Sequence, residues 1–187
     1  MELALKKLPA DYKVTVNWKP FFLNPQAPTP GVDKMEHYYQ KFGKERVDKM
    51  IPYMKEQGSK VGIKFSYKGK VGNTMDSHRL LYFARDNGKQ DEMIEKLMSY
   101  YFEQEKDISD SKVLEAAASE IGLKDAKEFL ATDKLKDEVV ADVDEVRQMG
   151  ISGVPAFIIN GEELLSGAQE TKTWVDILIE RGYIQKK

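Results

Sequence analysis

Cysteine is absent from the 187-residue sequence. Because thiolates carry out disulfide exchange and are common ligands of structural zinc, the chain as printed forms no disulfide and offers no cysteine nucleophile or zinc ligand. Histidine is scarce as well, since His37 and His78 are the only two and neither has the spacing of a metal-ligand motif. We therefore expect no metal site, although a cation site built from carboxylates stays open.

The sequence also lacks an excess of charge of one sign and any long apolar run. Lys and Arg number 29 against 31 Asp and Glu, which gives a net charge of -2. Such a balance offers no electrostatic reason to expect a nucleic acid or an anionic membrane as partner. No apolar run approaches the roughly 20 residues that cross a bilayer, and residues 1–8 do not resemble a secretory signal. We expect a cytoplasmic protein.

The N-terminal region combines a short helix with a strand. Residues 2–8 are typical of the last turns of a helix, which Pro9 ends. Residues 14–18 alternate and are rich in β-branched side chains, which predicts a strand that ends at Pro20.

The middle of the chain is helical throughout. Apolar residues recur there at three- and four-residue spacing, with Asp33 as the cap of the first helix and Gly58 as the end of the second. The helices are predicted at about residues 33–40, 43–57, 74–85, 90–105, 110–121, 124–132 and 133–149.

The C-terminal region returns to strands. Residues 156–159 read as a short buried strand, and Asn160 with Gly161 is a pair that favours a type I′ hairpin turn. Residues 162–165 form the return strand, and a final helix follows. The ends therefore predict an α/β domain formed by residues 1–32 and 150–187, which an all-helical insertion at residues 33–149 interrupts.

Several segments together resemble one family. Residues 153–159, which read Gly-Val-Pro-Ala-Phe-Ile-Ile, are similar to the cis-proline loop and strand of thioredoxin folds. Residues 18–25, 72–80 and 165–169 are similar to the DsbA-like family, which includes FrnE-type dithiol–disulfide isomerases, with residues 41–43 in support. The same superfamily holds 2-hydroxychromene-2-carboxylate isomerases and kappa-class glutathione transferases. The resemblance runs through about residues 2–183 and implies a thioredoxin-like fold with a large helical insertion.

The resemblance also implies a departure from the family pattern. Relatives begin with a strand and then a Cys-x-x-Cys motif, or a serine in the glutathione-using branch, at the start of the first helix. We expect this chain to begin inside that helix, so that both the first strand and the motif are missing. In the family sheet that strand would lie between residues 14–18 and 156–159. Its absence would leave a gap of about 10 Å with unpaired backbone groups on both sides. We therefore expect a fragment, an alternative start, or a sheet whose neighbouring strands close up or recruit another strand.

The family resemblance implies two groups of site residues. A substrate would contact the proline loop and residues beside it, namely Gly153, Val154, Pro155, Phe22, Asn24, Asn73, Thr74 and His78. Glutathione would be held by the segment before the last helix, namely Ser166, Gly167, Ala168 and Gln169. Each group has a structural alternative: Pro155 as a trans proline that starts an edge strand, Asn73 or Thr74 as a helix cap, His78 as a packed histidine, and Ser166 with Gln169 as a capping box.

Three functions follow from the resemblance. The first is a DsbA-like thiol–disulfide oxidoreductase or isomerase that is redox-inactive as written, because it keeps the substrate-holding loop and lacks the attacking thiolate. The second is a glutathione-dependent isomerase or transferase. The third is a non-catalytic module that binds a thiol- or disulfide-bearing peptide or a small apolar ligand. No cofactor is required apart from glutathione in the second hypothesis, and a homo-oligomer is an open expectation.

Overall fold

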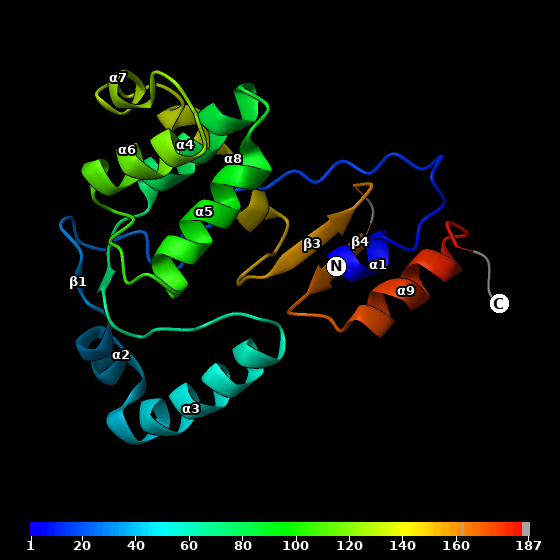
Figure 1. Ribbon diagram of the computed structural model, residues 1–187, viewed down its shortest axis with the longest axis horizontal. Helices are drawn as coiled ribbons and strands as arrows, with labels where there is room; N and C mark the ends of the chain where they lie inside the picture. The colour runs from blue at the N-terminus through cyan, green and yellow to red at the C-terminus, as the bar shows by residue number, and fades with distance from the viewer. Residues whose placement is uncertain (162, 185–187) are drawn as a thin grey trace. The chain divides into compact units, whose positions relative to one another are not determined.

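The chain, studied as a computed structural model, is described for residues 1–161 and 163–184 (Figure 1). It divides into two compact units. Unit 1 consists of residues 1–21 and 145–187, and unit 2 consists of residues 22–144. The sequence places the boundaries at 32/33 and 149/150, so unit 2 begins earlier than the predicted helical insertion. Residues 22–32 belong with the helices that follow because the Pro28 carbonyl accepts from the Asn73 N–H at 3.0 Å and the Phe22 ring packs against His78.

Unit 1 is built around a β-hairpin and two helices. The hairpin strands are β3 (Ala156–Ile159) and β4 (Glu163–Ser166), and the helices are α1 (Glu2–Leu5) and α9 (Thr171–Glu180). A cluster of Ala4, Trp174 and Leu178 forms its core, with Phe157, Ile159 and Leu165 packed against it. The ends of the sequence therefore combine, as expected, because α1 and α9 both bury apolar residues under the hairpin.

The hairpin has the register and turn that the sequence predicts. β3 and β4 are antiparallel, with Ala156 opposite Ser166 and Ile159 opposite Glu163. Asn160 and Gly161 have φ values of 50° and 76°, and this left-handed backbone is why Asn-Gly suits the turn. Glu162, the first residue of the predicted return strand, lies outside the described residues.

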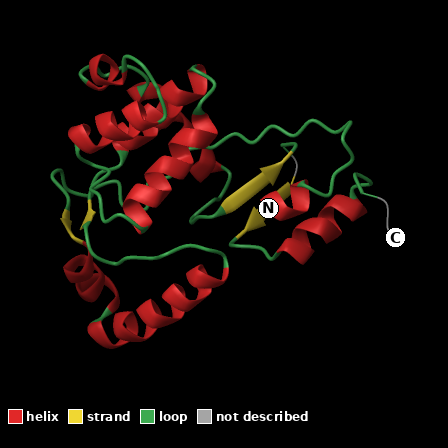
Figure 2. Ribbon diagram, viewed as in Figure 1, coloured by secondary structure: helices red, strands yellow, loops and turns green. Residues whose placement is uncertain are grey.

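The predicted strand at residues 14–18 is wrong. Both sheets of the described chain have two strands each, and neither includes this segment (Figure 2). The burial of side chains still alternates there, since Val16 and Trp18 are half-buried whereas Thr15 and Asn17 are exposed. Alternation alone does not make a strand, because a strand also needs a neighbour for its backbone hydrogen bonds.

Unit 2 contains most of the helices and a two-stranded sheet. Strands β1 (Val32–Asp33) and β2 (Lys70–Val71) pair antiparallel. The helices wholly in unit 2 are α2 (Lys34–Phe42), α3 (Lys44–Lys60), α4 (Met75–Asp86), α5 (Gln90–Phe102), α6 (Ser111–Glu120) and α7 (Ala126–Leu130). Helix α8 (Lys136–Gln148) begins in unit 2 and ends in unit 1. The core lies where α4 packs against α5, α6 and α7, around Leu80, Tyr82, Met93, Tyr100, Leu114 and Phe129.

The first two helices of unit 2 follow the predicted caps except at Gly58. The Asp33 side chain accepts a hydrogen bond from the Glu36 N–H at 2.8 Å, as a helix cap does. Gly58, predicted to end α3, lies inside it and is buried, and the helix continues to Lys60. The cause is packing, because a Cβ on Gly58 would lie 2.5 Å from Cδ2 of Phe65. Glycine is needed there for close approach.

Three later helices are shorter than predicted. Helix α5 ends at Phe102 because Glu105 has a left-handed φ of 61°. Helices α7 and α8 are separated by a segment in which Leu135 has φ 63°. The apolar pattern continues through such positions, whereas the helical conformation of the backbone ends there. No described helix is both long and apolar enough to cross a bilayer.

Candidate functional site

The proline loop of unit 1 leads from helix α8 into strand β3. The peptide bond between Val154 and Pro155 is cis. The loop starts after Ile151, which is buried and donates its N–H to the Val146 carbonyl at 3.3 Å. It ends at Phe157, whose ring packs edge-on against Trp174 with centroids 4.8 Å apart. Because both flanks are anchored, the loop is held in place while its own side chains face solvent.

The loop presents an apolar surface. Val154 is 49% exposed, Pro155 is exposed and Gly153 is half-buried. The Pro155 carbonyl accepts a hydrogen bond from the Gly167 N–H at 2.8 Å, which ties the loop to the end of β4. Apolar side chains exposed on an anchored loop are suited to contact another apolar group.

The strand that follows the loop has one open edge. In an antiparallel pair of strands, every second residue faces its partner with its hydrogen-bonding groups. Pro155 is such a residue, because its carbonyl accepts from the Gly167 N–H, and so Phe157 and Ile159 are also residues of this kind. The backbone groups of Ala156 and Ile158 therefore point away from β4. Within the described residues, no hydrogen bond engages these outward groups, and the structure shows none for the Val154 backbone. Unpaired N–H and C=O groups at an exposed edge can pair with an added strand.

The predicted glutathione segment is occupied by its own hydrogen bonds. The Gln169 amide donates to the carbonyl of Ser166 at 2.9 Å and to that of Gly167 at 3.3 Å, and the Gly167 N–H is bonded to Pro155. The predicted capping box of Ser166 and Gln169 is wrong, because α9 begins only at Thr171. Ala168 is exposed on this segment. Two of the expected donors are thus already used within the chain.

The remaining predicted site residues lie in unit 2, three of them (Asn73, Thr74 and His78) at the start of helix α4 and two (Phe22 and Asn24) in the segment before β1. The Asn73 side chain accepts a hydrogen bond from the Met75 N–H at 2.9 Å, and its own N–H donates to the Pro28 carbonyl at 3.0 Å. The Thr74 side chain makes no capping bond, although Thr74 is the N-cap residue. The capping alternative is therefore confirmed at Asn73.

Phe22 and His78 meet beside this helix end. Their ring centroids lie 5.3 Å apart at an interplanar angle of 52°, and both side chains are half-buried. His78 is therefore packed against an aromatic ring, as the structural alternative expects. Asn24 is exposed, and its side chain accepts from the Gln26 N–H at 3.0 Å, which stabilises a turn.

An open edge along residues 156–159 is expected from the family resemblance, whereas the two residues that form it in β3 were missed as site residues. Ala156 and Ile158 do not appear among the predicted site residues, although the pattern contains the necessary signal. Phe157 and Ile159 supply the core face, so Ala156 and Ile158 take the opposite face and the alternate backbone direction. The alternation alone does not show which edge of the strand lacks a neighbour; the family resemblance does, because the first strand that we expect to be missing would lie beside residues 156–159.

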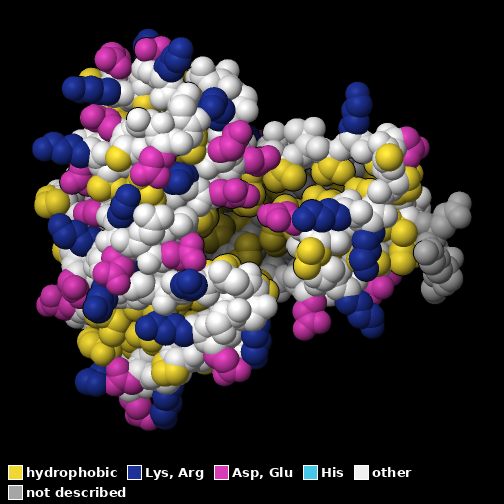
Figure 3. Space-filling model, in the orientation of Figure 1, with side chains coloured by type: hydrophobic (Ala, Val, Ile, Leu, Met, Phe, Trp, Pro, Cys, Tyr) yellow, Lys and Arg dark blue, Asp and Glu magenta, His cyan; other side chains and the backbone are white. Residues whose placement is uncertain are grey.

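No side-chain cluster in the described residues suits a metal ion, since no group of three or more His, Asp or Glu residues lies suitably close. Lys and Arg are interspersed with Asp and Glu on the visible face of unit 2 (Figure 3). The surface shown therefore has no large area of a single charge that would attract a polyanion.

Comparisons with known proteins identify the family. The DSBA-like thioredoxin domain matches residues 1–178. The chain is similar to a solved structure, the probable DsbA oxidoreductase of Streptomyces coelicolor, with 25% sequence identity and a TM-score of 0.88. The match covers 100% of this chain and 83% of that one. The search of curated proteins found no match. The chain belongs to the DSBA-like thioredoxin domain family, with a thioredoxin fold and a helical insertion.

Proposed function

We propose that the chain, as printed, binds extended thiol- or disulfide-bearing peptides at the proline loop and carries out no thiol–disulfide exchange itself. The family supports the kind of partner, because its members are thiol–disulfide oxidoreductases. The observation that carries the binding proposal is the exposed Val154–Pro155 loop, which continues into the open backbone edge of β3. Lack of exchange follows from the absence of cysteine, since a thiolate must attack the disulfide.

Binding would combine two contacts. An extended peptide can place its backbone along Ala156 and Ile158, where β-strand addition supplies main-chain hydrogen bonds. The exposed Val154 side chain then contacts an apolar side chain of the peptide, which supplies selectivity. A small apolar ligand would use only the second contact and should bind more weakly.

We place the chain, within this proposal, in the FrnE-type branch rather than the glutathione-using branches. The segments at residues 72–80 and 165–169 are similar to the DsbA-like family that includes the FrnE type. The glutathione hypothesis has less support because Gly167 and Gln169 already bond within the chain. A cytoplasmic location fits the same branch.

Peptide binding is tested by fluorescence anisotropy with a labelled extended peptide that carries one mixed disulfide. We expect saturable binding, and we expect Val154→Arg to weaken it by roughly tenfold, a loss of about 1.4 kcal/mol. The matched control is Val140→Arg on α8, a valine that is 40% exposed and lies outside the loop. Equal loss in both variants, or no saturable binding at all, would contradict the proposal.

Redox inactivity is tested separately by insulin reduction. The chain should not accelerate the reduction of insulin by dithiothreitol above the rate without protein, because no thiolate is available to relay electrons. Acceleration that scales with the concentration of the chain would overturn this part of the proposal and leave the binding result to be judged by itself.

A further inference from the structure

The outer edge of β3 has no neighbour within the described sheets. β3 pairs only with β4, so the N–H and C=O groups of Ala156 and Ile158 face outward. Ile158 is 45% exposed, so the strand is open to solvent on the side opposite the core. An isolated two-stranded hairpin is marginally stable in water, and a third strand would add hydrogen bonds and bury more apolar surface.

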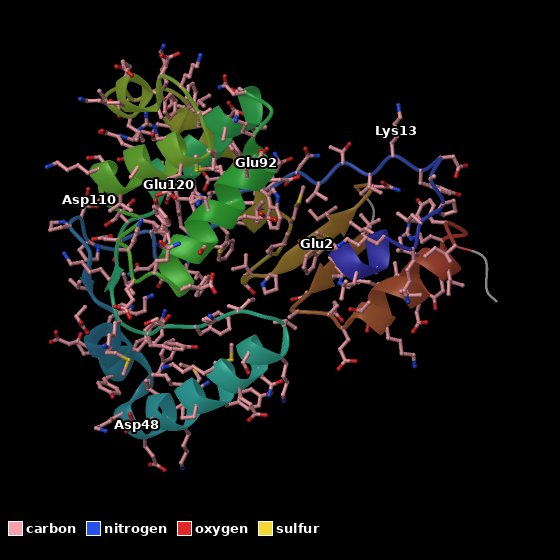
Figure 4. All side chains as sticks on the ribbon, viewed as in Figure 1. Glu2, Lys13, Asp48, Glu92, Asp110 and Glu120 are labelled. Atoms are coloured by element: carbon pink, nitrogen blue, oxygen red, sulfur yellow. The ribbon has the colours of Figure 1, made fainter. Side chains whose placement is uncertain are left out.

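A second segment of unit 1 has the complementary property. Residues 14–17 make no hydrogen bond in the described structure, although Val, Thr and Val are strong strand formers. Val14 is 50% exposed, and at the neighbouring position the Lys13 side chain points away from the ribbon (Figure 4). The segment offers strand sequence without a strand partner.

We propose that two copies of the chain associate by pairing residues 14–18 of each copy with the outer edge of β3 of the other. Each copy gives one strand and receives one, so the contact is reciprocal and closes with twofold symmetry. The hydrogen-bonding groups of Ala156 and Ile158 then meet those of the other copy's segment. This association goes beyond the proposed function, and it would compete with peptides for the same edge.

The second copy is favoured over pairing within one chain because the segment is anchored at both ends. Ala4 lies in the core against Trp174 and Leu178, and Pro20 is fully buried. In the resulting conformation the segment belongs to the same compact unit as β3 and yet does not pair with it. Val14, Thr15 and Asn17 are exposed in that conformation, so this part of the segment is open to a second copy while both anchors stay in place.

Both exchanged strands contribute to the surface area that such a dimer buries. The reciprocal arrangement therefore buries more area than the addition of one strand. One added strand alone supplies few hydrogen bonds, whereas two symmetric additions double them at a single cost in lost rotational and translational freedom. Charge does not oppose the association strongly, because each copy carries a net charge of only -2.

The association is tested by light scattering coupled to size-exclusion chromatography over roughly a hundredfold range of concentration. We expect the mass to rise from 21.4 kDa towards twice that value. Hydrogen–deuterium exchange at the same concentrations should show protection that appears together in residues 14–18 and at the amides of Ala156 and Ile158.

The discriminating variant is Thr15→Pro/Val16→Pro, which removes one amide donor towards each edge of the segment. It should stay monomeric at every concentration, and because neither amide is bonded in the single chain, the fold should survive. The matched control is Ala10→Pro, at the second position of the turn in which Tyr12 N–H bonds to the Pro9 carbonyl, where proline is favoured. The control should associate as the unmodified chain does.

Three outcomes would overturn the proposal. One is a mass of 21.4 kDa throughout the concentration range. Another is a dimer that the double-proline variant still forms, which would place the contact elsewhere. The third is protection of residues 14–18 that does not depend on concentration, which would show pairing within one chain.

Discussion

Lys34, at the first position of α2, is a lysine with only 2% of its surface exposed. Its ammonium group donates to the Tyr101 carbonyl at 2.9 Å and lies 3.7 Å from the centre of the Tyr101 ring. Burial lowers the pKa of Lys34 to about 8, although the carboxylate of Glu105 acts in the opposite direction. Since the ordinary pKa of lysine is 10.5, the folded chain releases this proton more easily than the unfolded chain.

The pH dependence of stability follows from that difference. Between about pH 8 and 10.5 the unfolded chain binds more protons at Lys34, so this residue makes the free energy of unfolding rise with pH, by no more than about 3 kcal/mol. The variant Lys34→Met should lack that contribution. Urea unfolding of both proteins from pH 7 to 10.5 measures it. Parallel curves for the two proteins would contradict the assignment, because all other titrating groups are shared.

Arg79 is a second buried cation, and its hydrogen bonds hold the segment between α7 and α8. Its guanidinium donates to the Lys134 carbonyl at 2.8 Å, to the Thr132 carbonyl and to Asp76 at 2.7 Å. Lysine cannot reproduce this fork. We expect Arg79→Lys to lower the free energy of unfolding by about 2–4 kcal/mol in urea titrations. A loss below about 1 kcal/mol would show that the fork contributes little.

At the scale of the element, helix α3 shows packing overriding helix propensity. Alanine usually stabilises a helix relative to glycine by about 1 kcal/mol. At Gly58, however, an added Cβ would lie 2.5 Å from the Phe65 ring and 2.9 Å from the Ile63 carbonyl oxygen. We expect Gly58→Ala to lower the midpoint of thermal unfolding, at a cost of about 1–3 kcal/mol.

A double variant isolates the cause of that loss. In a Phe65→Leu background the ring is gone, so Gly58→Ala should cost less than in the unmodified chain. Stabilisation by the single variant would mean that the ring moves aside freely and that propensity decides.

The same elements show how far the sequence predicts the structure. Helix positions follow from apolar spacing, and the Asn160–Gly161 turn follows from two residues that tolerate positive φ. The end of α3 and the strand at residues 14–18 do not, because each depends on a packing or pairing neighbour. Phe65 lies on Gly58, and in the described part of the chain Val14 has no strand beside it. A local sequence pattern reflects the helix or strand propensity of its residues, whereas the end of α3 and the pairing of residues 14–18 depend on contacts with other parts of the fold. The loop at Val154 could be identified from its motif, and the open edge from the strand that the resemblance implies is missing. The outward direction of the Ala156 and Ile158 backbone groups needed the register of the hairpin.

At the scale of the whole molecule, the two units differ in their cores. Unit 2 buries large side chains from several helices, including Leu80, Tyr82, Met93 and Tyr100. Unit 1 depends on a small cluster around Trp174 and a two-stranded hairpin. Less buried apolar surface gives a smaller free energy of unfolding. We expect unit 1 to unfold at a lower denaturant concentration than unit 2.

The tryptophans make that difference measurable. Both tryptophans of the chain, Trp18 and Trp174, belong to unit 1, whereas most helical residues belong to unit 2. Circular dichroism at 222 nm reports helix. The denaturant concentration at the midpoint should therefore be lower by tryptophan fluorescence than by circular dichroism, and such separate transitions reveal departure from two-state behaviour. Coincident transitions would show that the units unfold as one.

The central claim is that the backbone edge of β3 beside Val154 is the binding surface of the chain. Amide hydrogen exchange at Ala156 and Ile158, measured in dilute protein with and without the disulfide-bearing peptide, tests it most directly. The account predicts rapid exchange in the free protein and marked slowing at both amides when the peptide saturates. Saturable peptide binding that leaves both amides unprotected would contradict it.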